Sequence, residues 1–389
     1  MRKLLFVATE DWFVRSHFLP MVARAKADGW ETVVAARVGD AAKDLEAAGA
    51  RVAPLSGVRG RLSPGAVLAE AAEMRRVLKE ERPDLIHAIA LKPCFVVSLA
   101  MGAAPDAGIA FAITGMGYLS ARDLRMRLAR AAALQFIADA AQRRSAIMVL
   151  ENDHDRRKFE KRGVRREMTA ILPGAGIDPA RLTLSEPPSA PPIRVGLAAR
   201  LLRSKGIEDA IEAVQILRAR GSPIELAIAG APDPDNPASY SEADMARWNA
   251  LPGVACRGWT SDISRFWADA HIGVFPSRGG EGLPKSMLEA AALRRAIVAT
   301  DAPGCRDFVE HEATGLLAPR SDPAALADAI ARLADDAALR SRLAEAAYVK
   351  ARSGYTEEIV ARTVAQAWEA ALAAKRGVIA PTRRAPAPA

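Results

Sequence analysis

Short apolar runs of strand length alternate with helix-like segments along almost the whole chain, and this alternation limits the fold more than any other feature. LLFVA (4–8) and ETVVAAR (31–37) are followed by helical patterns over 18–29 and 41–50. Further strand-like runs lie at 85–90, 108–114 and 146–151, with an alanine-rich helix expected over about 125–143. Because continuous apolar strands joined by helices form parallel sheets covered on both faces, we expect a doubly wound α/β fold.

A proline-rich stretch divides this alternation into two parts. DPARLTLSEPPSAPPI, residues 178–193, contains five prolines and no clear periodicity, and strand-like runs resume after it. The chain has 389 residues, which is more than one hydrophobic core usually serves. We therefore expect two Rossmann-like domains. The expected parts are an N-terminal domain (1–177), a linker (178–192), a C-terminal domain (193–355), a terminal helix (356–376) and a disordered tail (377–389).

Composition narrows the setting in which the protein works. Apolar residues make up 50% of the chain and charged residues 26%, which is typical of a globular protein. The three cysteines are widely spaced and show no metal-ligand or redox spacing, which favours a reducing compartment. Because no apolar run is long enough to span a bilayer without a charge, we expect a cytoplasmic protein that at most lies on a membrane surface.

Positive charge is concentrated in one stretch of the first part. Between Arg122 and Arg166 there are 13 Arg and Lys against 6 Asp and Glu, whereas the whole chain has a net charge of +8. Solvated helix faces would explain this stretch, and so would a patch for anionic lipid headgroups or a diphosphate-bearing substrate. Aromatic side chains for base stacking are scarce there, so nucleic acid is not an expected partner.

Two stretches of the second part carry the chemistry. In GLAARLLRSKG (196–206), Arg200 and Lys205 follow a strand and precede a helix, where two cations suit a diphosphate. In SRGGEGLPKSMLEAA (278–292), glycines surround Glu281 ahead of a helix expected to begin at Pro284. Glycines at this position let backbone N–H groups approach an anion, and a carboxylate there suits sugar hydroxyls beside a phosphate.

These motifs resemble those of the retaining GT-B glycosyltransferases of family 4. Arg200 and Lys205 match that family's R-x4-K pair, and Glu281 and Glu289 match its E-x7-E pair. The resemblance extends over essentially the whole second part. In the first part, EDWFVRSHFLP (10–20), PDLIHAIALKP (83–93) and AITGMGYL (112–119) are similar to a bacterial subgroup that builds surface polysaccharides (capsule, O-antigen or exopolysaccharide) on a polyprenyl diphosphate carrier.

The resemblance implies a hexosyltransferase whose two domains face a central cleft. It implies a nucleotide diphosphate sugar as donor, with UDP as the expected nucleotide, a polyprenyl-diphosphate-linked saccharide as acceptor, retention of configuration and no metal or other cofactor. Arg200 and Lys205 would neutralise the donor diphosphate, Glu281 would hold sugar hydroxyls and Glu289 the ribose. Further donor contacts are implied for Gly258, Trp259, Gly280, Gly282, Leu283, Pro284 and Lys285, and acceptor contacts for Ser16, His17 and Lys92.

The chain departs from the family pattern at the catalytic histidine. Many members carry this residue two positions after the one occupied here by His87, where this chain has Ile89. His87 is kept as a catalytic candidate, and His87, His17 or neither can face the reacting sugar.

Several other functions compete with sugar transfer to a lipid-linked acceptor. A dinucleotide enzyme would carry G-x-G-x-x-G after the first strand, where this chain reads VATEDWFV, and GMGYLS (115–120) lacks the third glycine. A sugar-nucleotide epimerase or a transferase to a non-lipid acceptor stays open, and so does a sugar- or lipid-binding protein. The D-x-D triplets beginning at Asp153 and Asp233 could suggest a metal-dependent transferase, but the second lies in a proline-rich turn and the first in the basic stretch.

Overall fold

The computed structural model describes residues 1–61, 63–115, 124–234 and 236–375. It divides the chain into two compact units, each built around its own parallel sheet. Most of GMGYLS (115–120), the second acid of the Asp233 triplet and the tail at 377–389 lie outside the described residues. Among the described residues, no helix combines the length and the apolar character that a bilayer span requires.

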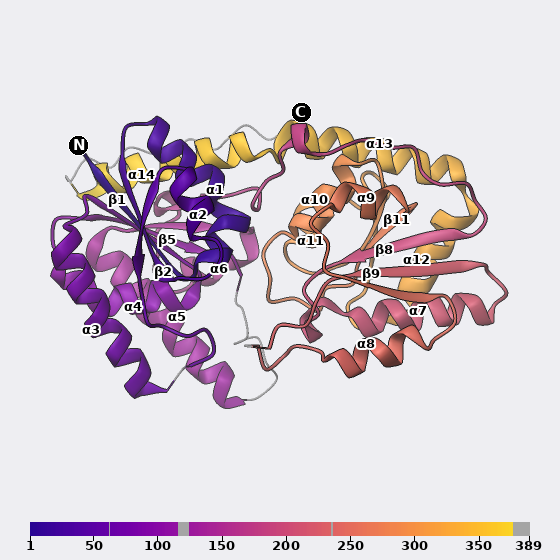
Figure 1. The fold of residues 1–389 in the computed structure, drawn as a ribbon, viewed down its shortest axis with the longest axis horizontal. Helices are drawn as coiled ribbons and strands as arrows, with labels where there is room; N and C mark the ends of the chain where they lie inside the picture. The colour runs from indigo at the N-terminus through magenta and orange to yellow at the C-terminus, as the bar shows by residue number, and fades with distance from the viewer. Residues whose placement is uncertain (62, 116–123, 235, 376–389) are drawn as a thin grey trace. The chain divides into compact units, whose positions relative to one another are not determined.

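The first unit contains a seven-stranded sheet in the order β3-β2-β1-β4-β5-β6-β7 (Figure 1). Its strands are buried on both faces, as the continuous apolar runs predict: all residues of β4 and β5 are buried. The strands are β1 (Lys3–Glu10), β2 (Glu31–Arg37), β3 (Ala50–Pro54), β4 (Leu85–Ile89), β5 (Gly108–Ile113), β6 (Ile147–Leu150) and β7 (Thr169–Ile171).

Helices cover both faces of this sheet. Helices α1, α2 and α14 pack on one face, and α3, α4 and α5 on the other. Helix α1 starts at Asp11 rather than at residue 18, because DWFVRSH (11–17) is already helical. The helices of the unit are α1 (Asp11–Ala27), α2 (Ala42–Ala47), α3 (Pro64–Glu81), α4 (Leu91–Ala100), α5 (Leu124–Arg144), α6 (Asp153–Glu160) and α14 (Glu357–Lys375).

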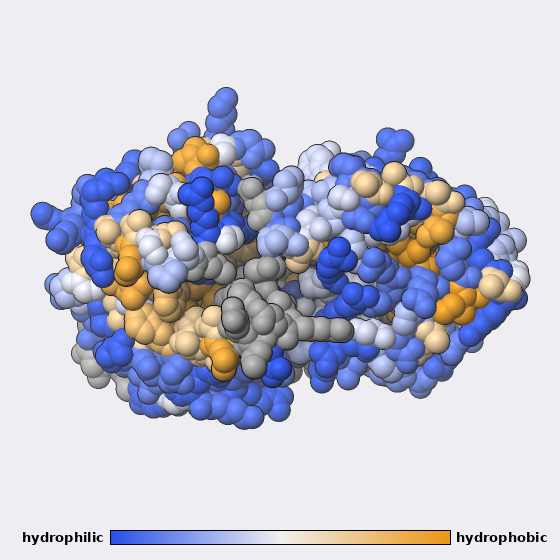
Figure 2. All heavy atoms as spheres, turned by 90° about the horizontal axis from the view of Figure 1, so that it is seen from below, coloured by the Kyte–Doolittle hydropathy of each residue, from blue (hydrophilic) through white to orange (hydrophobic). Residues whose placement is uncertain are grey.

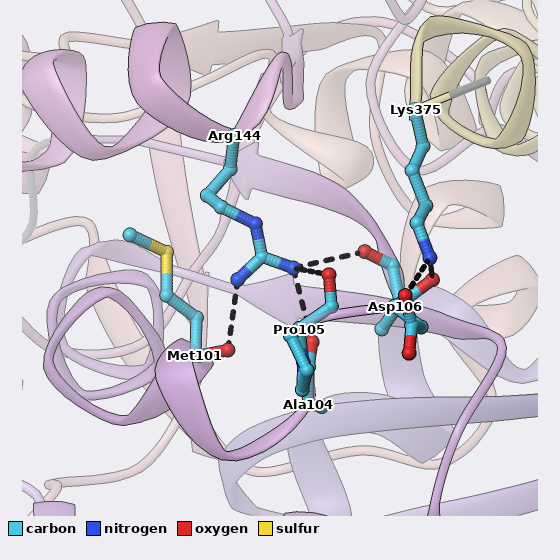
Figure 3. A network of polar contacts seen from close by, with 7 residues as sticks. Met101, Ala104, Pro105, Asp106, Arg144 and Lys375 are labelled. Carbon is cyan, nitrogen blue, oxygen red and sulfur yellow. Dashed lines mark hydrogen bonds and ion pairs between the residues drawn. The ribbon is translucent and has the colours of Figure 1, made fainter.

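Helix α14 comes from the far end of the chain and completes the core of the first unit. Its Trp368 is 1% exposed and packs edge-on against Phe6 of β1. The end of the helix is anchored by Lys375, whose ammonium contacts Asp106 through the backbone oxygen and, at 3.1 Å, through Oδ1 (Figure 3). Beside this contact, the Arg144 guanidinium donates to four backbone oxygens in the turn after α4, at 2.8–3.2 Å.

The second unit spans Gly176–Thr356 and contains a six-stranded sheet in the order β10-β9-β8-β11-β12-β13. Helices α7 and α12 pack on one face, and α9, α10, α11 and α13 on the other. The strands are β8 (Ile193–Ala198), β9 (Ile224–Ala229), β10 (Val254–Gly258), β11 (Ile272–Phe275), β12 (Ala296–Thr300) and β13 (Leu316–Ala318). The helices are α7 (Ile207–Ala219), α8 (Glu242–Asn249), α9 (Ile263–Ala268), α10 (Lys285–Ala292), α11 (Cys305–Phe308), α12 (Pro323–Asp335) and α13 (Ala337–Gly354).

The proline-rich segment at 178–192 is part of this second unit. Thr183 donates its backbone N–H to Ser264 Oγ at 3.1 Å, and the buried Arg295 donates to the Ser185 backbone oxygen at 2.7 Å. His271 Nε2 lies 2.8 Å from the Pro188 backbone oxygen. The segment is therefore held on the second unit by side chains from α9 and from the residues that directly precede β11 and β12.

Candidate functional site

The carboxyl ends of β8 and β11 line an open hollow in the second unit, here called the second-unit hollow. The strand order reverses between these two neighbours, and ligands of open α/β sheets bind where this reversal occurs. The lining comes from the end of β8 (197–199), from β11 and the turn after it (274–277), and from Lys205, Glu281, Pro284 and Ser286.

Lys205 and Glu281 meet in this hollow as an ion pair between Nζ and Oε2. The two side chains are 20% and 17% exposed, so the pair is largely withdrawn from water but reaches the hollow. Lys205 ends the short helix η5 (Arg203–Lys205), and Glu281 follows β11. The structure thus brings together two residues that the sequence motifs place far apart. The ammonium can bind an anion, and the carboxylate can accept hydrogen bonds from hydroxyl groups.

Gly206 allows the two loops that carry this pair to approach each other. Its φ is +66°, in the left-handed region, and a Cβ added there would lie 1.9 Å from the Pro276 backbone oxygen. Only glycine fits both the conformation and the space. The position of Lys205 relative to Glu281 therefore depends on the absence of a side chain at the next residue.

Arg278 fixes the same two loops from the other side. Its guanidinium contacts both carboxylate oxygens of Asp209, at 2.9 Å through Nε and at 2.5 Å through an Nη. Its backbone N–H donates to the Ser204 backbone oxygen at 2.8 Å. Asp209 is 5% exposed and lies in the first turn of α7, so the contact anchors the β11 loop on that helix. A charged residue inside a glycine-rich loop is the sequence signal that could have identified Arg278.

The residues behind the hollow are buried and tightly packed. Gly282 and Leu283 are buried, and a Cβ on Gly304, whose φ is +83°, would lie 2.2 Å from the Gly282 backbone oxygen. Thr300 donates its hydroxyl to the Ser277 backbone oxygen at 2.5 Å. The glycine-rich segment is thus held in place by contacts at both ends.

Helix α10 begins one residue later than the sequence suggests. Pro284 is its N-cap, with an extended backbone, and Lys285 is the first helical residue. Pro284 still lines the hollow, and Gly280 lies in the bend before it with φ +85°. Glu289 is half-buried on α10 and does not line the hollow.

The remaining residues expected at the donor site lie outside the hollow. Arg200 is 46% exposed and forms an ion pair with Asp233 at 3.1 Å. Gly258 ends β10, which is separated from β8 by β9, and Trp259 directly after it is 73% exposed. These residues lie around the carboxyl edge of the sheet rather than in one cluster, and their contacts with a donor stay a prediction.

The acceptor candidates separate into two places in the first unit. Lys92 lines a hollow beside the end of β1, where its Nζ pairs with Glu70 Oε1 at 2.7 Å. Ser16 and His17 lie on α1, with Ser16 Oγ 2.5 Å from His17 Nδ1, and neither lines that hollow.

His87 is a core residue, which corrects its assignment as a catalytic group. Its side chain is fully buried, and its Nδ1 accepts a hydrogen bond from Trp368 Nε1 at 2.8 Å. Burial lowers the pKa of His87 to about 3, so the imidazole is neutral at ordinary pH. A ring enclosed by Phe6, Phe18 and Trp368 cannot reach a substrate.

The two acidic triplets serve local structure. Asp155 accepts hydrogen bonds from Asn152 and Lys158 at the start of α6, and Asp153 pairs with Arg156 at 2.7 Å. The Asp233 backbone oxygen accepts from the Asn236 N–H at 2.8 Å, which closes a turn. Within the described ranges, no group of three His, Cys, Asp or Glu side chains is placed to hold a metal ion.

Both units match known protein families. Residues 14–175 match the family described as "Glycosyl transferase 4-like domain", and residues 192–336 match "Glycosyl transferases group 1". The GT-B fold is shown by a solved structure, HepE of Anabaena in complex with UDP and glucose, which has a TM-score of 0.75 at 20% identity and covers 95% of this chain and 100% of that one.

Two curated relatives share part of the sequence. The amylovoran biosynthesis glycosyltransferase AmsK of Erwinia amylovora is 30% identical over 46% of this chain and 45% of its own. The N,N'-diacetylbacillosaminyl-diphospho-undecaprenol alpha-1,3-N-acetylgalactosaminyltransferase of Campylobacter jejuni is 31% identical over 43% and 42%. The matches thus span less than half the length of these curated relatives.

Proposed function

Because this chain carries both domains of the GT-B glycosyltransferases, we propose that it is a hexosyltransferase that moves a sugar from a UDP-sugar to a polyprenyl-diphosphate-linked saccharide during surface polysaccharide synthesis. The observation that carries the proposal is the Lys205–Glu281 pair in the second-unit hollow. It combines an anion-binding ammonium with a hydroxyl-accepting carboxylate at the place where parallel sheets bind ligands.

Donor binding exchanges the partners of this pair. The ammonium of Lys205 turns from Glu281 to the diphosphate, and the Glu281 carboxylate becomes available to the hydroxyls of the donor sugar. Arg200, which follows the lining residue Ala199 and is half exposed and paired with Asp233, supplies the second positive charge. Charge-assisted hydrogen bonds of this kind are shorter and about twice as strong as neutral ones.

The reaction joins the acceptor hydroxyl oxygen to the anomeric carbon while the bond from that carbon to the diphosphate breaks. The acceptor proton passes to the departing phosphate oxygen, and UDP leaves. Lys205 and Arg200 stabilise the charge that develops on the diphosphate, and Glu281 orients the sugar. Since the diphosphate serves as base on the face it leaves, the configuration at the anomeric carbon is retained and no metal ion takes part.

Names of similar proteins support the choice of substrates. The HepE structure contains UDP and glucose, and the Campylobacter relative is named for an undecaprenyl-diphosphate-linked acceptor. A sugar-nucleotide epimerase of the same fold, or a transferase to an acceptor without a lipid, is the alternative. Sugar transfer that requires an added acceptor distinguishes the proposal from an epimerase.

We further propose that the protein works at the inner face of the bacterial plasma membrane. Leu68 on α3 and Leu128 on α5 are 60% and 62% exposed, and Arg127 beside Leu128 is exposed as well. Figure 2 shows a face of the first unit on which apolar side chains gather between charged ones. Co-sedimentation with anionic vesicles that weakens at high salt, and fails with uncharged vesicles, is the expected result.

The experiment that tests the function incubates the protein with a panel of UDP-sugars and glycosylated polyprenyl diphosphates and follows UDP release and lipid-linked product. We expect product with one donor–acceptor pair, and its loss in Glu281→Ala. A matched control is Glu212→Ala, which removes a carboxylate from the middle of α7, away from the lining of the hollow. No product from any pair, or a Glu281→Ala variant as active as the parent, would contradict the proposal.

A further inference from the structure

The first unit has a hollow at the same place in its sheet as the second-unit hollow. It lies between the carboxyl end of β1 and the start of α4, the helix that follows β4, and is open to solvent. In the first sheet the strand order reverses between β1 and β4, just as it reverses between β8 and β11 in the second. This first-unit hollow therefore occupies the ligand position of a doubly wound sheet.

A partly buried ion pair projects into this first-unit hollow. Lys92 Nζ contacts Glu70 Oε1 at 2.7 Å and the Val58 backbone oxygen at 2.7 Å. The two side chains are 14% and 13% exposed, and both line the hollow. Withdrawing two charges from water is costly, and such groups in a largely apolar pocket are characteristic of binding sites.

A second carboxylate lines the same wall. Glu73, one turn after Glu70 on α3, accepts hydrogen bonds from the backbone N–H of Ser56 at 3.1 Å and from its hydroxyl at 2.8 Å. These bonds hold the segment after β3 over the hollow. Gly57 in that segment leaves room for the Glu70 side chain, because a Cβ at residue 57 would lie only 3.2 Å from Glu70 Cδ.

The rest of the wall is apolar. Val7, Leu55, Met74 and Val96 line it, with the Thr9 side chain at the end of β1. An apolar wall can pack against the C–H face of a sugar ring, while carboxylates accept hydrogen bonds from its hydroxyls. Among the lining residues, two carboxylates face one ammonium, so the excess charge is negative.

We propose that the first-unit hollow is the subsite for the sugar of the acceptor and that it selects uncharged or amino sugars over uronic acids. This inference rests on the proposed sugar transfer and names the acceptor class that the transfer uses. Glu70 and Glu73 accept hydrogen bonds from the sugar hydroxyls, and Lys92 donates a hydrogen bond to a ring or hydroxyl oxygen. A carboxylated sugar is repelled by the two glutamates, and the acceptor's own diphosphate binds outside the hollow.

The test uses ligand-observed saturation-transfer NMR on the full chain, with UDP at saturating concentration to occupy the second-unit hollow. Methyl glucoside, methyl glucosaminide and methyl glucuronide are the probes, each at millimolar concentration. We expect saturation transfer to the first two and an affinity for the glucuronide at least about tenfold lower. Equal binding of all three, or binding of none, would overturn the proposal.

Three variants assign the binding to this hollow. Gly57→Val fills it without removing a charge and is expected to weaken glucoside binding at least about tenfold. Gly65→Val is the matched control, because a Cβ there meets nothing within 4 Å. Glu70→Gln keeps the shape but removes a negative charge, so the ratio of the affinities for the glucoside and the glucuronide should decrease. This variant tests the charge argument even if Gly57→Val fails to fold. An unchanged ratio in Glu70→Gln would contradict the charge argument.

UDP binding by the same proteins, measured by calorimetry, separates this inference from the proposed function. If the parent binds the neutral sugars but not UDP, the donor assignment fails while the first-unit hollow stands. If all variants bind UDP as the parent does and Gly57→Val still binds the glucoside normally, the subsite is wrong and the donor site stands.

Discussion

The two units have a hollow at the corresponding place in their sheets, but different charged side chains surround it. Each sheet reverses its strand order once and has a hollow at that point, and each hollow contains one Lys–Glu ion pair, Lys205–Glu281 in the second unit and Lys92–Glu70 in the first. In the second unit Arg200 follows the lining residue Ala199 but lies outside the hollow, where it pairs with Asp233 at 3.1 Å. In the first unit a further glutamate, Glu73, lines the hollow beside Lys92 and Glu70.

Under the proposed function, the second-unit hollow takes the donor and the first-unit hollow takes the acceptor sugar. A UDP-sugar brings a diphosphate, which requires cations, whereas a neutral acceptor sugar brings only hydroxyls. The fold places the two ligand positions, and a few charged side chains decide what each accepts. Changes in one hollow should therefore affect one substrate and spare the other.

The largest effect is expected from Lys205→Met. Without the ammonium, the charge on the departing diphosphate loses its main partner, and kcat/KM should fall about 10²–10³-fold. Lys92→Met should instead raise the KM for the acceptor and leave the KM for the donor close to that of the parent. Steady-state kinetics with each substrate varied in turn measures the KM for the donor and the KM for the acceptor. If Lys205→Met and Lys92→Met changed these two constants in the same way, the two hollows would not serve different substrates.

A smaller effect is expected from Gly206→Ala, which separates the loops of the second unit without touching a charge. The added Cβ would collide with the Pro276 backbone oxygen, and the left-handed φ alone costs about 1–2 kcal/mol. We expect a loss of about 10–100-fold in kcat/KM from misplacement of Lys205, together with a lower melting temperature.

Arg278→Lys is the companion change for Gly206→Ala. It keeps the charge but not the two-pronged contact with Asp209, so it should lower kcat/KM in the same direction with a smaller loss of stability. Parent-like kinetics in both variants would show that the loop contacts do not position the ion pair.

The stability of the two units should depend differently on pH because of their buried histidines. The pKa of His87 is lowered from 6.5 to about 3 by burial, so below pH about 6.5 the unfolded chain binds a proton that the folded chain does not. Stability is therefore complete above pH 6.5 and falls as pH decreases through this window, by at most about 1.4 kcal/mol per pH unit. His87→Phe should reduce this slope.

His271 in the second unit is the control for this pH effect. Burial lowers its pKa as well, but its hydrogen bond to the Pro188 backbone oxygen opposes that shift. His271→Gln should therefore change the pH dependence of urea unfolding less than His87→Phe does. The reverse order would mean that burial does not keep His87 neutral in the folded chain.

The smallest effect is expected where the end of α14 contacts the rest of the first unit. The Lys375–Asp106 contact is largely exposed, with Asp106 at 97%, so Lys375→Ala should cost at most about 1 kcal/mol. Arg144→Met beside it should cost more, about 1.5–3 kcal/mol, because it leaves backbone oxygens without their charged donor. Urea unfolding of the two variants compares them, and equal losses would contradict the assignment of the main anchor to Arg144.

The architecture was predictable from the sequence because buried parallel strands leave continuous apolar runs. The expected strand at 31–37 coincides with β2, and the expected helix over 206–219 differs from α7 by one residue. Helices α3 and α4 were not expected, and for this reason Glu70, Glu73 and Gly57 could not be identified from the sequence. A carboxylate in an ordinary helix becomes part of a site only when the fold packs it beside another element.

The second-unit site was predictable in part. Lys205 and Glu281 meet as the motifs suggest, because both follow strands whose carboxyl ends are neighbours. His87 was misassigned, because a histidine inside a strand gives no indication of which element will cover it. Here the cover is α14, which comes from the far end of the sequence and contributes Trp368. Long-range packing of this kind leaves no trace in local patterns.

Calorimetric titration of UDP into the parent, Lys205→Met and Lys92→Met tests the central comparison most directly. The two variants remove the same group, a lysine ammonium that is paired with a glutamate, from the two hollows. The account predicts that Lys92→Met binds UDP as the parent does and that Lys205→Met binds it about 10–150-fold more weakly, as expected for the loss of one charged hydrogen bond. Equal affinity in all three proteins, or a loss confined to Lys92→Met, would contradict it.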